Sequence, residues 1–229
     1  MTLDEQLAQE LIDIAEDVPK VYESGQKSEY DRFWDGYQDN GNRTSCAFLF
    51  AGKGWTNDVF QPKYSIKPSN AYGMFWQTGI SGDLEKFFDE KGIVLDFSKC
   101  SYTNYCFSQA NSIKTVGIVD VSSAEKGLMQ TFAYNSGIET IRVFKVREEQ
   151  TYSSIFPGCT SLKNIEIEGV IGNNFEIQQS PLTHESLMSI INHLGTVTTA
   201  KTLTLGSTNL AKLTDAEKAI ATERGWTLA

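Results

Sequence analysis

The sequence predicts an α/β solenoid, in which the chain winds through successive turns that each add one strand to a parallel sheet. Three segments, 107–118, 132–143 and 156–167, repeat at a spacing of 24 to 25 residues. Each begins with phenylalanine and carries an aliphatic residue six positions later, with two more aliphatics at offsets of nine and eleven. A repeat of this length is one structural unit that buries its aliphatics by stacking on its neighbours.

The spacing of the aliphatics within each unit, L-x-x-L-x-L, is typical of leucine-rich repeats. Extended outward, the pattern predicts about six right-handed turns. The first is a helix over 82–90 followed by a strand over 93–97, and strands near 115–119, 140–144 and 164–168 come next. Thr183 and Thr214 are predicted N-caps of two later helices. Strands are expected after them at 203–205 and 226–228.

The chain divides into three expected regions. Residues 1–40 form an acidic N-terminal helical segment with 11 acidic and 3 basic side chains, and the turn cluster at 39–42 marks its end. Residues 41–80 are rich in aromatics and are expected to form an irregular cap. Such a cap covers the apolar surface that the first turn would otherwise expose. Residues 81–229 form the predicted leucine-rich-repeat solenoid.

The N-terminal segment contains two predicted helices. In the first, over 3–18, four aliphatics follow the 4-3-4 spacing of a short heptad stripe: Leu7, Leu11, Ile14 and Val18. This stripe fits a homo-oligomer formed through the helix and fits equally a helix packed on its own domain. The second, over 27–37, places its aromatics on one face and is expected to contribute to a core.

The charge distribution limits the partners. The net charge is −9, of which −8 lies in residues 1–40. Phosphate backbones and anionic lipids both attract clustered cations, so we expect neither nucleic acid nor an anionic membrane as partner. No run of 18 apolar residues and no cationic leader followed by an apolar stretch is seen, so membrane insertion is not expected. An extracellular, virion or cytoplasmic location all remain open.

The sequence shows no pattern typical of an enzyme. The two histidines, His184 and His193, are nine residues apart on one predicted helix and belong to no metal or nucleophile motif. The four cysteines have no paired spacing of the kind that zinc sites use. We expect reduced core thiols, and the alternative is a disulfide between Cys100 and Cys106 across a turn. Cys159 occupies the position that Ala110 and Asn135 hold in the other repeats. We therefore predict no catalytic residues, no cofactor and no metal.

The open face of the strands is the predicted binding surface. Side chains alternate across a strand, so the residues between the aliphatics should face outward. Arg142 and Glu166 would then lie on adjacent strands, either as a cross-strand ion pair or as part of a polar contact surface with Phe144 as an aromatic anchor. The candidate binding residues are Asp96, Thr115, Thr140, Arg142, Phe144, Asn164 and Glu166.

One repeat resembles a known family. The segment from Phe156 to Ile167 resembles the F-x-x-C-x-S-L-x-x-I-x-I unit of BspA-type leucine-rich-repeat proteins, and units 107–118 and 132–143 match it more loosely. The flanking segments 21–25, 29–35, 40–44 and 213–228 are similar to uncharacterised leucine-rich-repeat proteins of gut Firmicutes and their prophages. The resemblance implies a bacterial surface or phage-associated protein, and it carries over no catalytic residues.

Together these observations predict a non-enzymatic protein-binding or assembly module that uses the open strand face, with a protein or a glycan as ligand. The alternative is a phage virion or tail structural protein without a ligand of its own. The resemblance supports either function, because BspA-type proteins are mostly surface binders of host proteins, whereas the phage-associated relatives look like virion components.

Overall fold

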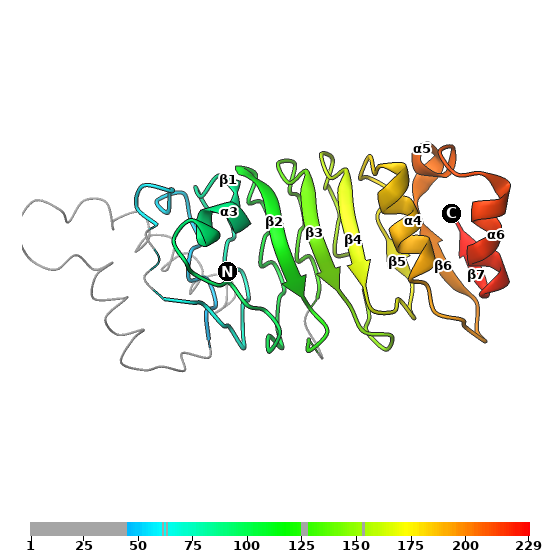
Figure 1. Cartoon of the computed structure of the whole chain (residues 1–229), viewed down its shortest axis with the longest axis horizontal. Helices are drawn as coiled ribbons and strands as arrows, with labels where there is room; N and C mark the ends of the chain where they lie inside the picture. Colours follow the sequence, from blue (N-terminus) through cyan, green and yellow to red (C-terminus); the bar gives the residue numbers. More distant parts are fainter. Residues whose placement is uncertain (1–44, 61, 63, 125–127, 153) are drawn as a thin grey trace, which may run out of the picture.

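The computed structural model describes residues 45–60, 62, 64–124, 128–152 and 154–229. The molecule is elongated, and its strands and helices follow one another along the long axis in sequence order (Figure 1). The two helices expected within residues 1–40, and the oligomer contact expected of the first, lie outside the described residues. Across the described residues, no helix combines the length and the apolar character needed to cross a membrane.

The first sheet has four parallel strands in sequence order. β1 (Gly82–Asp83) is followed directly by helix α3 (Leu84–Asp89), and then come β2 (Ile113–Asp120), β3 (Thr140–Lys145) and β4 (Asn164–Glu168). Asp83 caps α3 by accepting a hydrogen bond from the Lys86 amide at 3.0 Å.

The second sheet has three parallel strands: β5 (Phe175–Glu176), β6 (Lys201–Thr204) and β7 (Trp226–Leu228). Helix α4 (His184–Asn192) lies between β5 and β6 in the chain. Helices α5 (Gly206–Leu210) and α6 (Asp215–Glu223) lie between β6 and β7. Thr183 caps α4, and Thr214 and Glu217 form a capping box at α6. Both caps confirm predictions made from local sequence, because a cap depends on residues only two or three positions apart.

A column of phenylalanine rings runs through the core behind the first sheet. The centroids of neighbouring rings from Phe75 to Phe156 lie 5.2 or 5.3 Å apart. The ring planes are almost parallel, with interplanar angles of 5° or 6°. Phe50 extends the column at 5.4 Å from Phe75. Offset stacking of this kind adds to the free energy gained by burial. The complete column is Phe50, Phe75, Phe107, Phe132 and Phe156.

The backbone around each of these phenylalanines has the same unusual conformation. The residues two positions before and two positions after the ring all have positive φ, although seven of the ten are not glycine. The conformation lets successive segments hydrogen-bond to one another, as in Tyr105 N to Met129 O at 3.2 Å and Gln109 N to Ala133 O at 3.0 Å. It recurs around Phe50 and Phe75, within the region expected to be an irregular cap.

The predicted α/β solenoid of about six leucine-rich-repeat turns is wrong. The strands form two separate parallel sheets, one of four and one of three strands, and neither sheet closes. The predicted strand over 93–97 is absent, because only Leu95 makes an isolated bridge, with Ile66. Beyond β4 the first sheet ends where helix α4 lies against the strand edge.

All four cysteines are buried and none forms a disulfide, as expected. Burial raises the pKa of the Cys159 thiol to about 12 and also raises that of the Cys106 thiol well above its ordinary value. The Cys159 thiol donates a hydrogen bond to Phe132 O at 3.0 Å. Because the thiolate is the reactive form, these buried thiols are poor nucleophiles.

The capping box of α6 gives a pH-dependent contribution to stability. The backbone N–H and the hydroxyl of Thr214 donate to the Glu217 carboxylate and lower its pKa, with a further contribution from His184 at 2.8 Å. A carboxyl group whose pKa is lower in the folded chain than in the unfolded chain stabilises the fold at pH values above its unfolded-state pKa of ~4.3. This contribution is lost as the pH falls through the folded-state pKa.

We therefore expect Glu217→Gln to lower the free energy of unfolding at pH 7 and to lose this effect at a pH below the folded-state pKa of Glu217. Glutamine keeps the size and the hydrogen-bond acceptor, so the difference measures the charge. Urea unfolding of both proteins at the two pH values tests this, with Glu223→Gln at the end of the same helix as control. An equal deficit at both pH values would contradict the expected role of the carboxylate.

Candidate binding groove

The outward face of the first sheet forms a groove between two helices. Inward-facing side chains of β2, β3 and β4 pack into the core, and the residues between them face solvent. Helix α3 packs on the β2 side and helix α4 on the β4 side. We call this face, with the parts of α3 and α4 that border it, the strand-face groove.

Two serines attach α4 to the edge of β4. The Ile165 and Ile167 amides donate to the hydroxyls of Ser186 and Ser189 at 2.9 and 2.8 Å. A strand edge normally offers unpaired amides to another strand, and here side-chain oxygens accept from them instead. Thr183, the N-cap of α4, also donates to Ser186 at 3.1 Å. The helix is thereby fixed as one wall of the groove.

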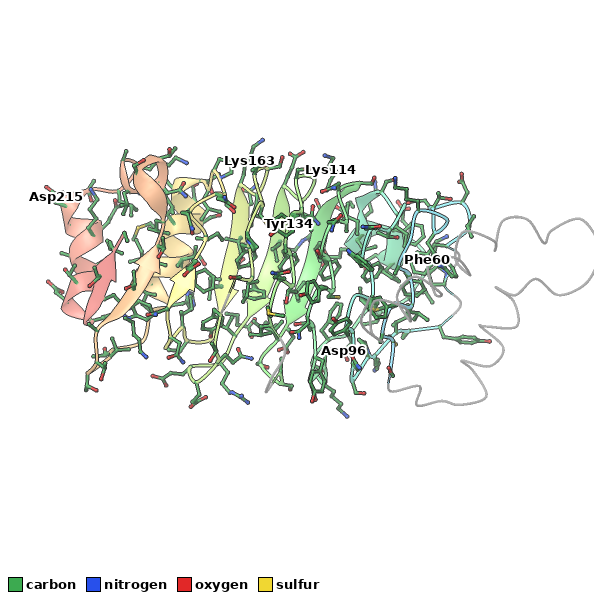
Figure 2. All side chains as sticks on the ribbon, turned by 180° about the vertical axis from the view of Figure 1, so that it is seen from behind. Phe60, Asp96, Lys114, Tyr134, Lys163 and Asp215 are labelled. Atoms are coloured by element: carbon green, nitrogen blue, oxygen red, sulfur yellow. The ribbon has the colours of Figure 1, made fainter. Side chains whose placement is uncertain are left out.

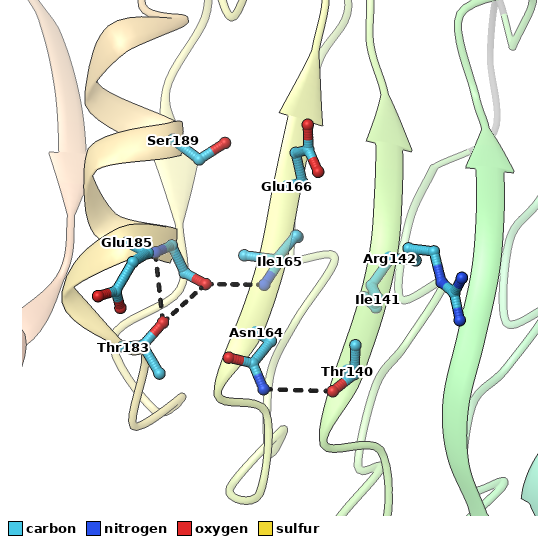
Figure 3. Close-up of a pocket in the computed structure, with 10 residues that line it drawn as sticks. Thr140, Ile141, Arg142, Asn164, Ile165, Glu166, Thr183, Glu185 and Ser189 are labelled. Carbon is cyan, nitrogen blue, oxygen red and sulfur yellow. Dashed lines mark hydrogen bonds between the residues drawn. The ribbon is translucent and has the colours of Figure 1, made fainter.

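One hollow of the groove lies between β3, β4 and α4 and has a volume of about 610 Å³. Its polar side chains come from all three elements. Figure 3 shows Ser189, Asn164 and Thr140 at the space between α4 and the strands, and the Glu185 carboxylate on the side of α4 that faces away from the strands. Asn164 donates to the Thr140 hydroxyl at 3.3 Å across the floor. The lining residues are Thr140, Ile141, Arg142, Asn164, Ile165, Glu166, Thr183, Glu185, Ser186 and Ser189.

Arg142 pairs with a residue that the sequence analysis did not consider. Its Nε atom lies 2.7 Å from Glu85 Oε2 on α3, and the Arg142 side chain points away from Glu166 (Figure 3). The Glu85 side chain crosses β2 directly over Gly117, where a Cβ atom would lie only 2.8 Å from the carboxyl carbon. The predicted Arg142–Glu166 ion pair is therefore wrong, because Gly117 leaves room for Glu85 to reach Arg142.

A second, smaller hollow of about 200 Å³ lies beside α3 and is largely apolar. Val94 and Ile118, which line it, are 55% and 48% exposed. Ile118 is paired in register with Val143 of β3, so the aliphatic surface continues toward the centre of the sheet. The Glu85–Arg142 pair separates this apolar hollow from the polar one.

Phe144 does not face the groove. It is fully buried and packs edge-on against Phe132 and Phe156, so its predicted role as an exposed aromatic anchor is wrong. The cause is a register shift between β3 and β4, where Arg142 and Val143 together lie opposite Glu166. An extra residue of this kind, a β-bulge, reverses the facing of every residue that follows.

The other candidate residues divide into two groups. Thr115, Thr140 and Asn164 are neighbours in register, as predicted, and Glu166 is exposed on the same face. Asp96 lines neither hollow. Figure 2 places it at the opposite edge of the molecule from Lys114 and Lys163. Its carboxylate accepts from Ser98, and these hydrogen bonds lower its pKa.

Sequence reasoning missed the groove residues that helices contribute, namely Glu85, Thr183, Glu185, Ser186 and Ser189. Thr183 was identified only as a cap. The missing information was the position of α4 beside β4, which depends on long-range packing. One local signal was present, since Ser186 and Ser189 share the face of α4 with the buried Leu187 and Ile190.

The Glu85–Arg142 pair is expected to contribute little to stability. The two side chains are 23% and 59% exposed. Glu85 Oε2 is shielded from solvent, but no described donor makes a well-aligned hydrogen bond to it. A double-mutant cycle with Glu85→Gln and Arg142→Gln should give a coupling of less than ~1 kcal/mol in urea unfolding. A coupling of several kcal/mol would show that the pair holds the fold.

Within the described ranges, no three His, Cys, Asp or Glu side chains converge as metal ligands. The groove offers hydroxyls, amides, carboxylates and aliphatic surface, which suit reversible contacts. No protein-family model matches the chain, and comparison with curated proteins and with solved structures gave no significant match.

Proposed function

We propose that this protein is a non-enzymatic binding or assembly module whose strand-face groove holds a protein or glycan ligand. The observation that carries the proposal is the polar hollow of about 610 Å³, which three separate elements line with side chains of several chemical types. Binding sites are commonly concave and combine apolar surface with a few placed polar groups. The resemblance of segment 156–167 to BspA-type repeats adds a bacterial surface or phage setting to the proposal.

The rigidity of the groove supports the same function. Its floor is a hydrogen-bonded sheet on the phenylalanine column, and serine side chains fix α4, its wall, to β4. A site on regular, well-packed elements loses little conformational entropy when a ligand binds. The surface therefore needs no rearrangement to accept a partner.

A screen with a blocked groove tests the proposal. The wild-type protein is applied to a glycan array and to a library of displayed random peptides, in parallel with Asn164→Trp, which places an indole in the polar hollow. Met129→Trp is the matched control, because Met129 is 45% exposed and lines neither hollow.

We expect ligands that bind the wild type and Met129→Trp but not Asn164→Trp. If no glycan or peptide depends on the groove, the proposal is wrong, and the alternative of a virion structural protein without its own ligand becomes the better account. Circular dichroism and urea unfolding of each variant separate a blocked groove from a failure to fold.

A further inference from the structure

We infer that the occupant of the strand-face groove is an extended segment of a partner protein, with an aliphatic side chain in the apolar hollow and a lysine or arginine in the polar one. This inference rests on the proposed function and narrows it from two ligand classes to one. It follows from the charges, the exposed aliphatics and the distance between the two hollows.

The charges of the groove are not balanced. Arg142, the one cation lining either hollow, is already paired with Glu85 at 2.7 Å. Glu166 and Glu185 line the polar hollow, and no described lysine or arginine forms an ion pair with either of them. A cationic side chain is the complement of this hollow, because it would meet the Glu166 carboxylate and hydroxyl acceptors, while the charge of Glu185 adds to the negative potential of the α4 wall.

The apolar hollow favours a peptide over a glycan. Its exposed apolar surface is aliphatic, from Val94 and Ile118, with the exposed Asp89 carboxylate beside it, and the one aromatic residue that lines it, Phe88, is 3% exposed. Sugar rings generally pack on exposed aromatic faces, and an uncharged glycan can hydrogen-bond to the free carboxylates but cannot balance their charge. An aliphatic side chain of a protein fits this hollow and would remove Val94 and Ile118 from water.

The distance between the hollows sets a spacing in the ligand. Ile118 lies on β2 and Glu166 on β4, two strand steps apart in the sheet. Neighbouring strands lie about 4.8 Å apart, so the two side chains are separated by about 10 Å across the sheet. An extended chain in the polyproline II conformation advances about 3.1 Å per residue and brings every third side chain back to the same face. The aliphatic and the basic residue should therefore be about three positions apart.

Peptide selection on the full chain tests the inference. Random peptides are selected on the wild type, and those that still bind Asn164→Trp are removed. The remaining peptides are expected to carry Lys or Arg about three positions from Leu, Ile or Val. A synthetic peptide of the consensus sequence is then measured by fluorescence anisotropy against charge variants.

We expect the combined change Glu166→Gln and Glu185→Gln to weaken this peptide roughly tenfold, which corresponds to the loss of one charge-assisted contact. Glu223→Gln removes an exposed carboxylate outside the groove and should leave the affinity unchanged. The loss should shrink at high salt, because salt screens exposed charges.

The inference is overturned if groove-dependent peptides show no enrichment of Lys or Arg, or if the double charge variant binds as tightly as the wild type. If the groove-dependent ligands are glycans or neutral peptides and none is a basic peptide, the inference is overturned and the proposed function stands. If no ligand depends on the groove, both the inference and the proposed function are wrong.

Discussion

Replacing Phe132 with alanine is expected to destabilise the protein by about 3–5 kcal/mol, the cost of removing a large side chain from a packed core. Phe132 is fully buried, and its ring stacks between those of Phe107 and Phe156. Its removal would leave a cavity in the middle of the column and would also expose one edge of Phe144. Urea unfolding followed by circular dichroism measures the change.

Phe132→Leu and Met129→Ala are the controls for this measurement. Leucine refills part of the space and should cost clearly less than alanine, whereas Met129 is 45% exposed and its truncation should cost little. A loss below about 1 kcal/mol for Phe132→Ala would contradict the account, because it would mean that the stacked column does not hold the successive segments together.

Replacing Asn135 with alanine is expected to cost about 2–4 kcal/mol, since it leaves the buried Gly137 and Ile138 amides without their acceptor and takes a second donor from two buried carbonyls. The Asn135 amide donates to Phe107 O at 2.8 Å and to Ala110 O at 3.3 Å. Its side-chain oxygen accepts from the amides of Gly137 and Ile138 at 3.1 and 3.0 Å. The side chain is fully buried, so water cannot replace these hydrogen bonds.

Cys159→Ala is the matched control, because Cys159 occupies the equivalent position one repeat later. Its thiol makes one weak hydrogen bond, to Phe132 O, where Asn135 makes four. We therefore expect Cys159→Ala to cost less than Asn135→Ala in the same unfolding assay. The reverse order would show that packing, and not the hydrogen bonds of the amide, decides the choice of residue at this position.

The sequence predicted the parts of the fold that depend on short spacings. The spacing of the aliphatic residues that follow Phe132 identified strand β3. The Thr214–Glu217 pair identified the start of α6. The units around Phe50 and Phe75 were missed because they lack aliphatics at offsets six and eleven and because the step from Phe75 to Phe107 is 32 residues. A periodicity search loses its signal when one step differs from the others.

The facing of side chains after position 142 could not be obtained from alternation alone. Buried residues in β3 are Ile141 and Phe144, three positions apart, whereas those in β4 are Ile165 and Ile167, two apart. This difference in the spacing of buried residues is caused by the bulge. It is recognised only when the two strands are compared in register. The division into two sheets depends on α4 lying beside β4, which no local pattern encodes.

The most direct test of the groove as the binding surface is a map of where a ligand binds. Backbone amide chemical shifts are followed by NMR while the strongest groove-dependent ligand is titrated into the wild-type protein. We expect the largest chemical-shift changes at residues that line the groove: Thr140, Arg142, Asn164, Glu166 and Ser189. Changes concentrated instead around Tyr134, which is 59% exposed and lines neither hollow, would contradict it.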